Sequence, residues 1–186
     1  MVLRGESFGI DFNPTVDRLR IVSDANQNLR VNVDTGALSD FDATVPGTQP
    51  DLDLQYAAGD PNSGQDPAVT GVAYRNSAPE ALGTTNTELY DIDANTNDMS
   101  EQTPPNNGTL VTVGALGVNT TRLVGFDIVT RGASPDGDRG FAALRPMGAD
   151  SSAFYAVDLG TEDATRIGSI VRGSMVEGLA IPIGHR

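Results

Sequence analysis

Two aspartates and an asparagine are the residues of this sequence best suited to bind a ligand. Asp11 and Asp127 occupy the same position in two copies of a recurring four-residue pattern, and Asn13 lies two residues after the first of them. If the strands that carry them converge, their carboxylate and amide oxygens are the ligands that a hard cation such as calcium prefers. We therefore predict a ligand-binding site at Asp11, Asn13 and Asp127, in which Asp11 and Asp127 would be the metal ligands.

A simpler interpretation of the same aspartates stays open, and we take it as the default. Short acidic side chains near turns often accept hydrogen bonds from backbone N–H groups. Arginines such as Arg18 and Arg20 also lie close in the sequence and could pair with them. In either case the carboxylates would stabilise the fold rather than hold a ligand. We expect no resident cofactor, and calcium is the one ion that the pattern suggests.

The composition excludes most other catalytic chemistry. The chain has no cysteine, and all 12 of its basic residues are arginines, so neither a thiolate nucleophile nor a lysine Schiff base can form. The one histidine, His185, is the penultimate residue. Tryptophan is missing, which disfavours the sugar-stacking cleft of a glycosidase. We therefore expect that the protein is not an enzyme.

The charge of the chain restricts its partners. There are 25 acidic residues against 12 basic ones, and the net charge of −13 would repel nucleic acid and acidic membrane surfaces. No apolar run approaches the roughly 18 residues that a membrane-spanning helix needs. We expect no nucleic-acid partner and no membrane insertion.

The recurring pattern indicates which elements position the two aspartates. Glycine, an apolar residue, Asp or Ala, and a second apolar residue occur at residues 9–12, 71–74, 125–128 and 178–181. After each of the first three copies come further runs of alternating apolar residues separated by turn residues, which is typical of β-propeller blades. Helical periodicity is absent, so the sequence predicts an all-β, β-propeller-like fold.

The repeats divide one domain, residues 1–186, into three predicted blades and a final strand. The blades cover residues 7–68, 69–122 and 123–175, and the closing strand covers residues 176–183. Three blades make a small ring. We therefore expect either that two chains associate to close the ring, or that this chain is the later part of a longer propeller. If the glycine-led copies are the innermost strands, Asp11 and Asp127 face the central channel.

Three other patterns have simple structural interpretations. Arg18, Arg20 and Arg30 share one phase on neighbouring predicted strands; they could bind an anion, but pairing with the surplus aspartates is the preferred interpretation. Residues 91–97 begin like a calcium loop but lack its glycine and glutamate, so we interpret them as a strand with outward-facing acids and a turn. Residues 39–67 are expected to form a long loop.

Several stretches of the chain resemble a known family. They are residues 7–14, 17–23, 27–30, 34–36 and 89–93, residue 102 with 104–110, and residues 113–118, 125–128 and 178–181. Together they are similar, over nearly the whole chain, to the bacterial and archaeal domain of unknown function family numbered 4394. The resemblance implies a propeller-like repeat domain, mostly in secreted proteins, with no established activity and no catalytic residues to carry over. Members usually have further repeats before the segment that matches Ser7, where this chain has six residues.

These observations lead to two functional hypotheses. The first is a non-enzymatic, extracellular or cell-surface β-propeller-like module that binds an unknown small-molecule ligand or assembles with itself. The alternative is a divalent-cation-dependent hydrolase, with calcium held by Asp11 and Asp127 in the channel.

Overall fold

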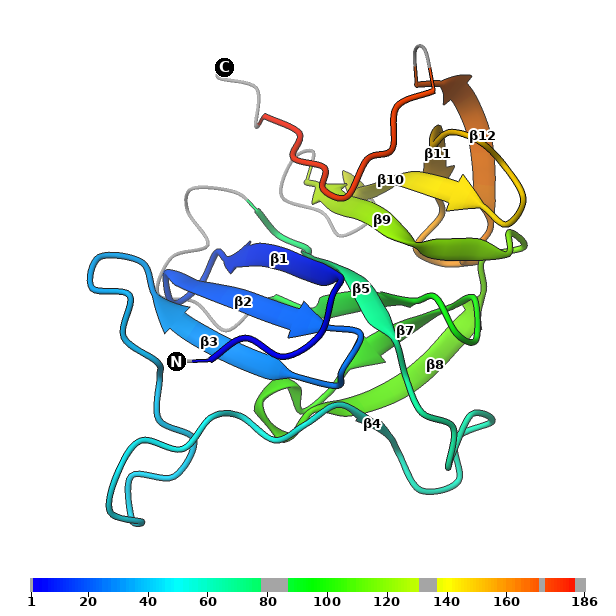
Figure 1. Ribbon diagram of the computed structural model, residues 1–186. Coiled ribbons are helices and arrows are strands. Elements are labelled where there is room, and N and C mark those ends of the chain that lie inside the picture. Colours follow the sequence, from blue (N-terminus) through cyan, green and yellow to red (C-terminus); the bar gives the residue numbers. More distant parts are fainter. Residues whose placement is uncertain (1, 78–86, 131–136, 171–172, 183–186) are drawn as a thin grey trace.

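The computed structural model describes residues 2–77, 87–130, 137–170 and 173–182, and these ranges form three β-sheets (Figure 1). The first sheet has the order β1-β2-β3, with β1 (Phe8–Asn13), β2 (Arg18–Ser23) and β3 (Asn28–Asn32). The second has the order β4-β8-β7-β6-β5, with β4 (Gln55–Tyr56), β5 (Val69–Tyr74), β6 (Leu89–Asp93), β7 (Asp98–Gln102) and β8 (Thr109–Ala115). The third has the order β12-β11-β10-β9, with β9 (Thr120–Val129), β10 (Arg139–Pro146), β11 (Ala153–Val157) and β12 (Ala164–Ser169).

The all-β prediction is confirmed. Within the described ranges Pro105–Asn107 forms a short 3-10 turn, and no helix there has the length and apolar character that crossing a bilayer requires. The strands form for the reason that the sequence suggests: short runs of alternating apolar residues are separated by turns. The β6–β7 turn shows the chemistry, because Asn97 takes a positive φ of 61° and Asp93 caps the turn by accepting the N–H of Asn95 at 2.7 Å.

The three sheets pack face to face in chain order. Between the first and second sheets, Val22 from β2 joins a core that includes Val72, Tyr74 and Leu110. Between the second and third sheets, side chains such as Ile92 and Phe126 form a larger core. Because strand side chains alternate in direction, β6 supplies the first core with Leu89 and the second with Tyr90 and Ile92. Both faces of the second sheet therefore contribute side chains to a core.

The segment between β3 and β5 is a long connection, as predicted, but part of it belongs to the second sheet. Gln55 and Tyr56 form β4, which pairs in parallel with Thr109 and Leu110 of β8. Leu54 and Tyr56 are buried in the core between the first two sheets. A segment inside the predicted first blade, residues 7–68, therefore completes the edge of the second sheet.

The described residues close no ring. β1, β5 and β9 lie next to one another in succession, and residues 178–181 run beside β9 (Figure 1). Over its described part, residues 176–182, the predicted closing strand belongs to no sheet, so a strand there is a wrong prediction; residue 183 lies outside the described residues. Ala180 and its neighbours follow β9 through backbone contact and one side-chain hydrogen bond rather than through a strand ladder.

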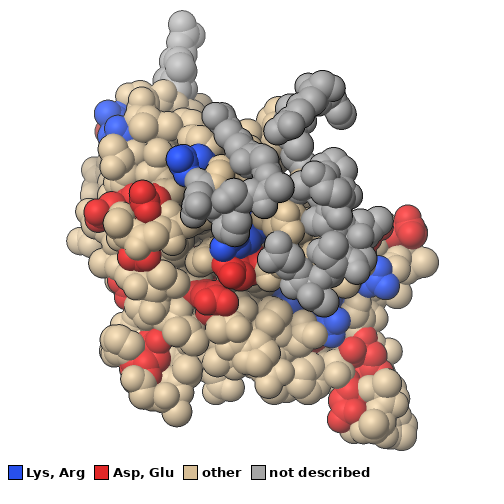
Figure 2. All heavy atoms as spheres, turned by 180° about the vertical axis from the view of Figure 1, so that it is seen from behind, with Lys and Arg blue, Asp and Glu red and all other residues tan. Residues whose placement is uncertain are grey.

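Acidic and basic side chains are interspersed on the surface. Figure 2 shows arginines close to acidic side chains in the middle of one face, with acidic side chains also at its margins. Arg75 bonds both Glu88, at 2.6 Å, and Asp138, at 2.8 Å, and Arg122 bonds Asp24 at 2.9 Å. Arg75 and Arg122 thus pair with acids, and the chain as a whole keeps a surplus of acids.

Candidate binding site at the glycine-led segments

The four copies of the glycine-led pattern meet at one place in the molecule. We call residues 9–12, 71–74, 125–128 and 178–181 the first to fourth glycine-led segments. The first three lie on β1, β5 and β9, which are edge strands of successive sheets. The fourth lies in the C-terminal stretch beside β9. The sequence pattern therefore marks positions that are equivalent in space.

Close approach of neighbouring atoms explains the glycine in the first three segments. A Cβ atom added at Gly71 would lie 2.6 Å from Cγ1 of Val124, and one at Gly125 would lie 2.6 Å from the carbonyl carbon of Gly178. Real Cβ atoms do not approach so closely, so only glycine lets each segment lie flat against the next. A Cβ atom added at Gly9 would lie 3.1 Å from the backbone oxygen of Thr70, which is a tight contact but less severe than those at Gly71 and Gly125. Each segment contacts its successor in chain order.

A cavity of about 400 Å³ opens where the four segments converge. Its walls are mainly apolar and include side chains such as Leu19 and Phe126. The carboxylates of Asp11 and Asp127 are its main polar groups, and Glu177 lies at its lining as well. This volume is within the range of small-molecule sites in proteins, and apolar walls with a few polar groups are typical of them.

Asp11 links the first segment to the second. One carboxylate oxygen accepts the N–H of Tyr74 at 2.6 Å, and the other accepts the N–H of Phe12 at 2.8 Å. Burial raises the pKa of Asp11 to about 7, an effect that the charge of Asp127 reinforces and that the two N–H donors oppose. The carboxyl group therefore changes its charge near neutral pH.

Asp127 has the same role between the third and fourth segments. Its carboxylate accepts the N–H of Ile181 at 2.6 Å. Burial raises its pKa above the usual value, although the hydrogen bonds from Ile181 and Ile128 oppose the rise. Among the described residues neither Asp11 nor Asp127 forms an ion pair.

The structure thus brings together two of the three predicted site residues. Asp11 and Asp127 line one cavity, whereas Asn13 caps its own turn by accepting the N–H of Thr15 at 2.9 Å and its hydroxyl at 2.8 Å. The default interpretation, in which the aspartates accept backbone N–H groups, describes these bonds. The donors lie in the aspartate's own segment and in the neighbouring one rather than in turns. The described residues contain no group of three His, Cys, Asp or Glu side chains that could hold a metal ion. A metal at Asp11 and Asp127 stays a prediction.

A buried ionic cluster of Arg20, Arg30 and Asp51 lies at the strands that follow β1 in the first sheet. Arg20 and Arg30 are direct cross-strand neighbours on β2 and β3, and both bond Asp51, with the Nη1 of Arg20 and the Nε of Arg30 each 2.7 Å from its Oδ2. The preferred interpretation of the arginine cluster is confirmed for these two residues. Arg18 differs, because it donates to the backbone carbonyls of Val16 and Asp17. No local signal in the long connection marks Asp51 as their partner.

The residues that imitate a calcium loop begin inside the protein, because residues 91–93 are buried, and Asn95 in the turn is exposed. Asp93 accepts hydrogen bonds from the hydroxyl of Tyr56, at 2.7 Å, and from the turn N–H of Asn95. Asp91 is fully buried and neither of its carboxylate oxygens has a hydrogen-bond partner among the described residues, so burial raises its pKa well above the usual value. The turn was predicted correctly, but the predicted outward orientation of the acids was wrong, because the first sheet packs over this face of β6.

Comparison with known proteins returns one family. The family described as Domain of unknown function (DUF4394) matches residues 1–180. No curated protein and no solved structure matches the chain.

Proposed function

Because the chain belongs to the DUF4394 family of domains of unknown function, we propose its role from its geometry: a non-enzymatic, β-propeller-like module that binds a small molecule. The observation that carries this proposal is the cavity of about 400 Å³ at the meeting point of all four glycine-led segments. Four distant parts of one chain line this pocket, and the close contacts between successive segments fix its walls, as a pre-formed ligand site requires.

The propeller-like arrangement is supported by the regular use of the two faces of each glycine-led segment. In the second and third segments, the apolar residues Val72 and Phe126 point to the preceding sheet, while Gly71 and Gly125 contact the following segment. Repeating one such step turns successive sheets about an axis, as in a propeller. We propose that further sheets complete the ring, from a second chain or from additional repeats of a longer polypeptide.

The chemistry of the cavity favours a ligand with an apolar body and a positive charge. The apolar walls would cover the body, and the two carboxylates are the groups that would attract a cation. Burial of these acids without a counter-charge raises both pKa values. A bound cation would favour the ionised carboxylates and would be held by them in return.

Titration with benzylammonium, followed by the amide NMR signals of isotope-labelled protein, tests the proposal. We expect the signals of Gly71 and Gly125 to shift together, and that of Gly36, in an open turn remote from the cavity, to stay in place. Neutral benzyl alcohol should bind more weakly. Asp127→Asn should weaken benzylammonium binding, whereas Asp34→Asn, which removes an exposed charge, should not. Shifts spread evenly over the surface, or none at the glycines, would contradict the proposal.

Calcium added in the same experiment addresses the alternative function, a cation-dependent hydrolase. If Asp11 and Asp127 hold calcium, millimolar calcium should raise the melting temperature, and Asp127→Asn should abolish the rise. We also propose an extracellular or cell-surface location, which rests on the family and agrees with a strongly acidic, lysine-free chain.

A further inference from the structure

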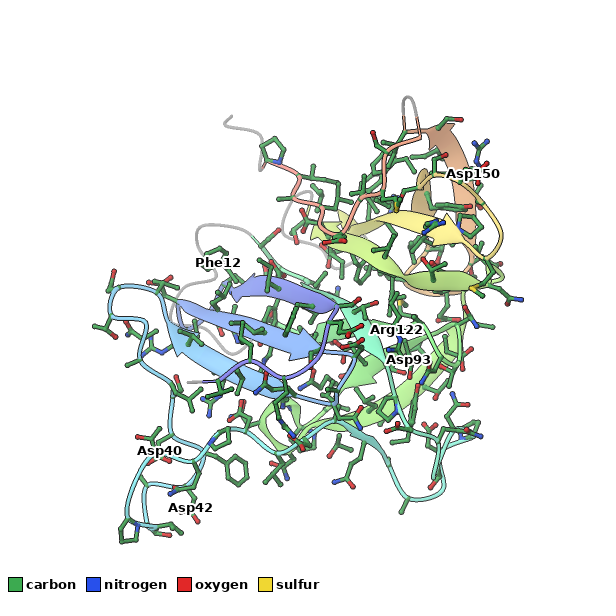
Figure 3. The ribbon with its side chains drawn as sticks, in the orientation of Figure 1. Phe12, Asp40, Asp42, Asp93, Arg122 and Asp150 are labelled. Carbon is green, nitrogen blue, oxygen red and sulfur yellow. The ribbon has the colours of Figure 1, made fainter. Side chains whose placement is uncertain are left out.

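One face of the first sheet lacks the cover that equivalent faces have. The second and fourth residues of the second and third glycine-led segments are at most 4% exposed, because the preceding sheet packs against them. In the first segment the equivalent residues, Ile10 and Phe12, are 60% and 58% exposed. Figure 3 shows Phe12 projecting from the end of β1. These two side chains have the apolar character of a core position and, within the described structure, no sheet over them.

The fourth segment has the complementary open side. In the first three segments a Cβ atom added at the glycine would come within 3.2 Å of atoms of the next segment or of the strand that carries it, whereas a Cβ atom added at Gly178 would meet no described atom within 4 Å. Ala180 is also exposed. The fourth segment therefore presents two small residues at the positions where the second presents Gly71 and Ala73.

An internal contact shows how these two open surfaces fit. Gly71 and Ala73 of the second segment lie against the side of β9 that carries Phe126 and Ile128, with Phe126 Cβ 3.2 Å from the position of an added Cβ at Gly71. Two small residues thus face two large apolar ones. The open surfaces repeat this combination, since Gly178 and Ala180 would face the isoleucine and phenylalanine of β1.

The hydrogen-bonding groups also agree. The side chain of Ala73 has no hydrogen-bond acceptor to offer the third segment. There the N–H of Ile128 donates to Asp127 of its own segment. Ala180 likewise offers none, and Phe12 N–H already bonds Asp11 of its own segment at 2.8 Å. If the fourth segment packs on the first, the N–H of Phe12 therefore keeps its acceptor, just as the N–H of Ile128 does where the second segment packs on the third.

We propose that the fourth glycine-led segment of one chain docks on β1 of a second copy of this chain, with Gly178 over Ile10 of the second copy. The inference rests on the propeller-like arrangement proposed above and assigns the surface that joins two copies. The contact is head to tail, so two chains that satisfy both of their open surfaces form a closed pair, and chains that do not close form longer polymers.

A cross-linking experiment tests this geometry directly, because the natural chain has no cysteine. The proposed contact places residue 178 of one chain and residue 10 of the other at the Cβ separation of the Gly71–Phe126 contact, close to that of a disulfide. Under mild oxidation, a mixture of Gly178→Cys and Ile10→Cys chains should give a covalent dimer. Neither variant alone should, because a head-to-tail contact does not bring a residue next to its own copy. Gly178→Cys mixed with Ile167→Cys, an isoleucine 52% exposed on β12, is the matched control.

Light scattering provides the second measurement. We expect the natural chain to show at least twice the monomer mass of 19.4 kDa at micromolar concentration, and Ile10→Asp to return it to the monomer while Ile167→Asp does not. Equal cross-linking in the control mixture, or a natural chain that stays monomeric at high concentration, overturns the docking proposal. A monomer that still binds benzylammonium at the glycine-led segments would overturn the docking alone and leave the proposed function standing.

Discussion

The carboxylate of Asp127 accepts a hydrogen bond from the backbone N–H of Ile181 at 2.6 Å, and this bond joins the third sheet to a segment that belongs to no sheet. The equivalent aspartate of the first sheet, Asp11, holds Tyr74 in the same way and at the same distance. A hydrogen bond to an aspartate thus takes the place of a strand ladder where the first segment meets the second and where the third meets the fourth.

Removal of this bond should release the C-terminal segment. In Asp127→Ala the N–H of Ile181 loses its acceptor, and we expect a cost of about 1 kcal/mol together with faster amide hydrogen exchange at residue 181. Asp34→Ala, which removes an exposed carboxylate, is the control. Unchanged exchange at Ile181 would show that backbone packing against Gly125 is sufficient to hold the segment.

A methyl group at Gly71 should destabilise the whole fold. The added Cβ would lie 2.6 Å from Val124 and 3.2 Å from Phe126, so the second and third sheets would have to separate locally. We expect Gly71→Ala to lower the free energy of unfolding in urea by about 1–3 kcal/mol. Gly168→Ala, in a strand position with open space around it, should change the free energy by a few tenths at most. Similar values for the two variants would contradict the close contact.

The raised pKa of Asp11 predicts a pH-dependent stability. The group ionises near its usual value of 3.8 in the unfolded chain and at about 7 in the folded protein, so folding takes up a proton between these values. The contribution of Asp11 to stability is therefore full below pH 4, decreases as the pH rises, and is constant above about 7. Unfolding measured from pH 4 to 8 should show Asp11→Asn gaining stability relative to the natural chain over this interval. A constant difference would mean that the pKa is not raised.

Asp51 should be far more important than a neighbouring acid that also forms an ion pair. Asp51 bonds the buried Arg20, and its loss leaves that guanidinium without a counter-charge inside the protein. We expect Asp51→Asn to cost about 3–5 kcal/mol in urea unfolding. Asp53, whose partner Arg4 is half exposed, should cost less than about 1 kcal/mol when changed to Asn. Equal costs would show that the ion pair of Arg20 and Asp51 is not shielded from solvent.

Much of the architecture is predictable because its causes are local. The alternation of apolar residues in β2 and β3 predicts strands from neighbouring positions alone, and the glycine-led repeat identifies four equivalent segments from the sequence. The same repeat correctly pairs Asp11 with Asp127 as residues of one kind, and the arrangement around one cavity follows from that equivalence.

The partners of the polar groups depend on the tertiary structure. Asn13 has the same residue type and distance from Asp11 whether it caps its turn or faces the cavity, and only the packing decides that it caps the turn. Asp51 reaches Arg20 because the long connection folds over the first sheet, and Asp91 is buried because that sheet covers β6. The local sequence pattern determines whether a residue lies in a strand or a turn. The partner of a charged side chain such as Arg20 lies far away in the chain, and the packing of the sheets decides which partner it reaches.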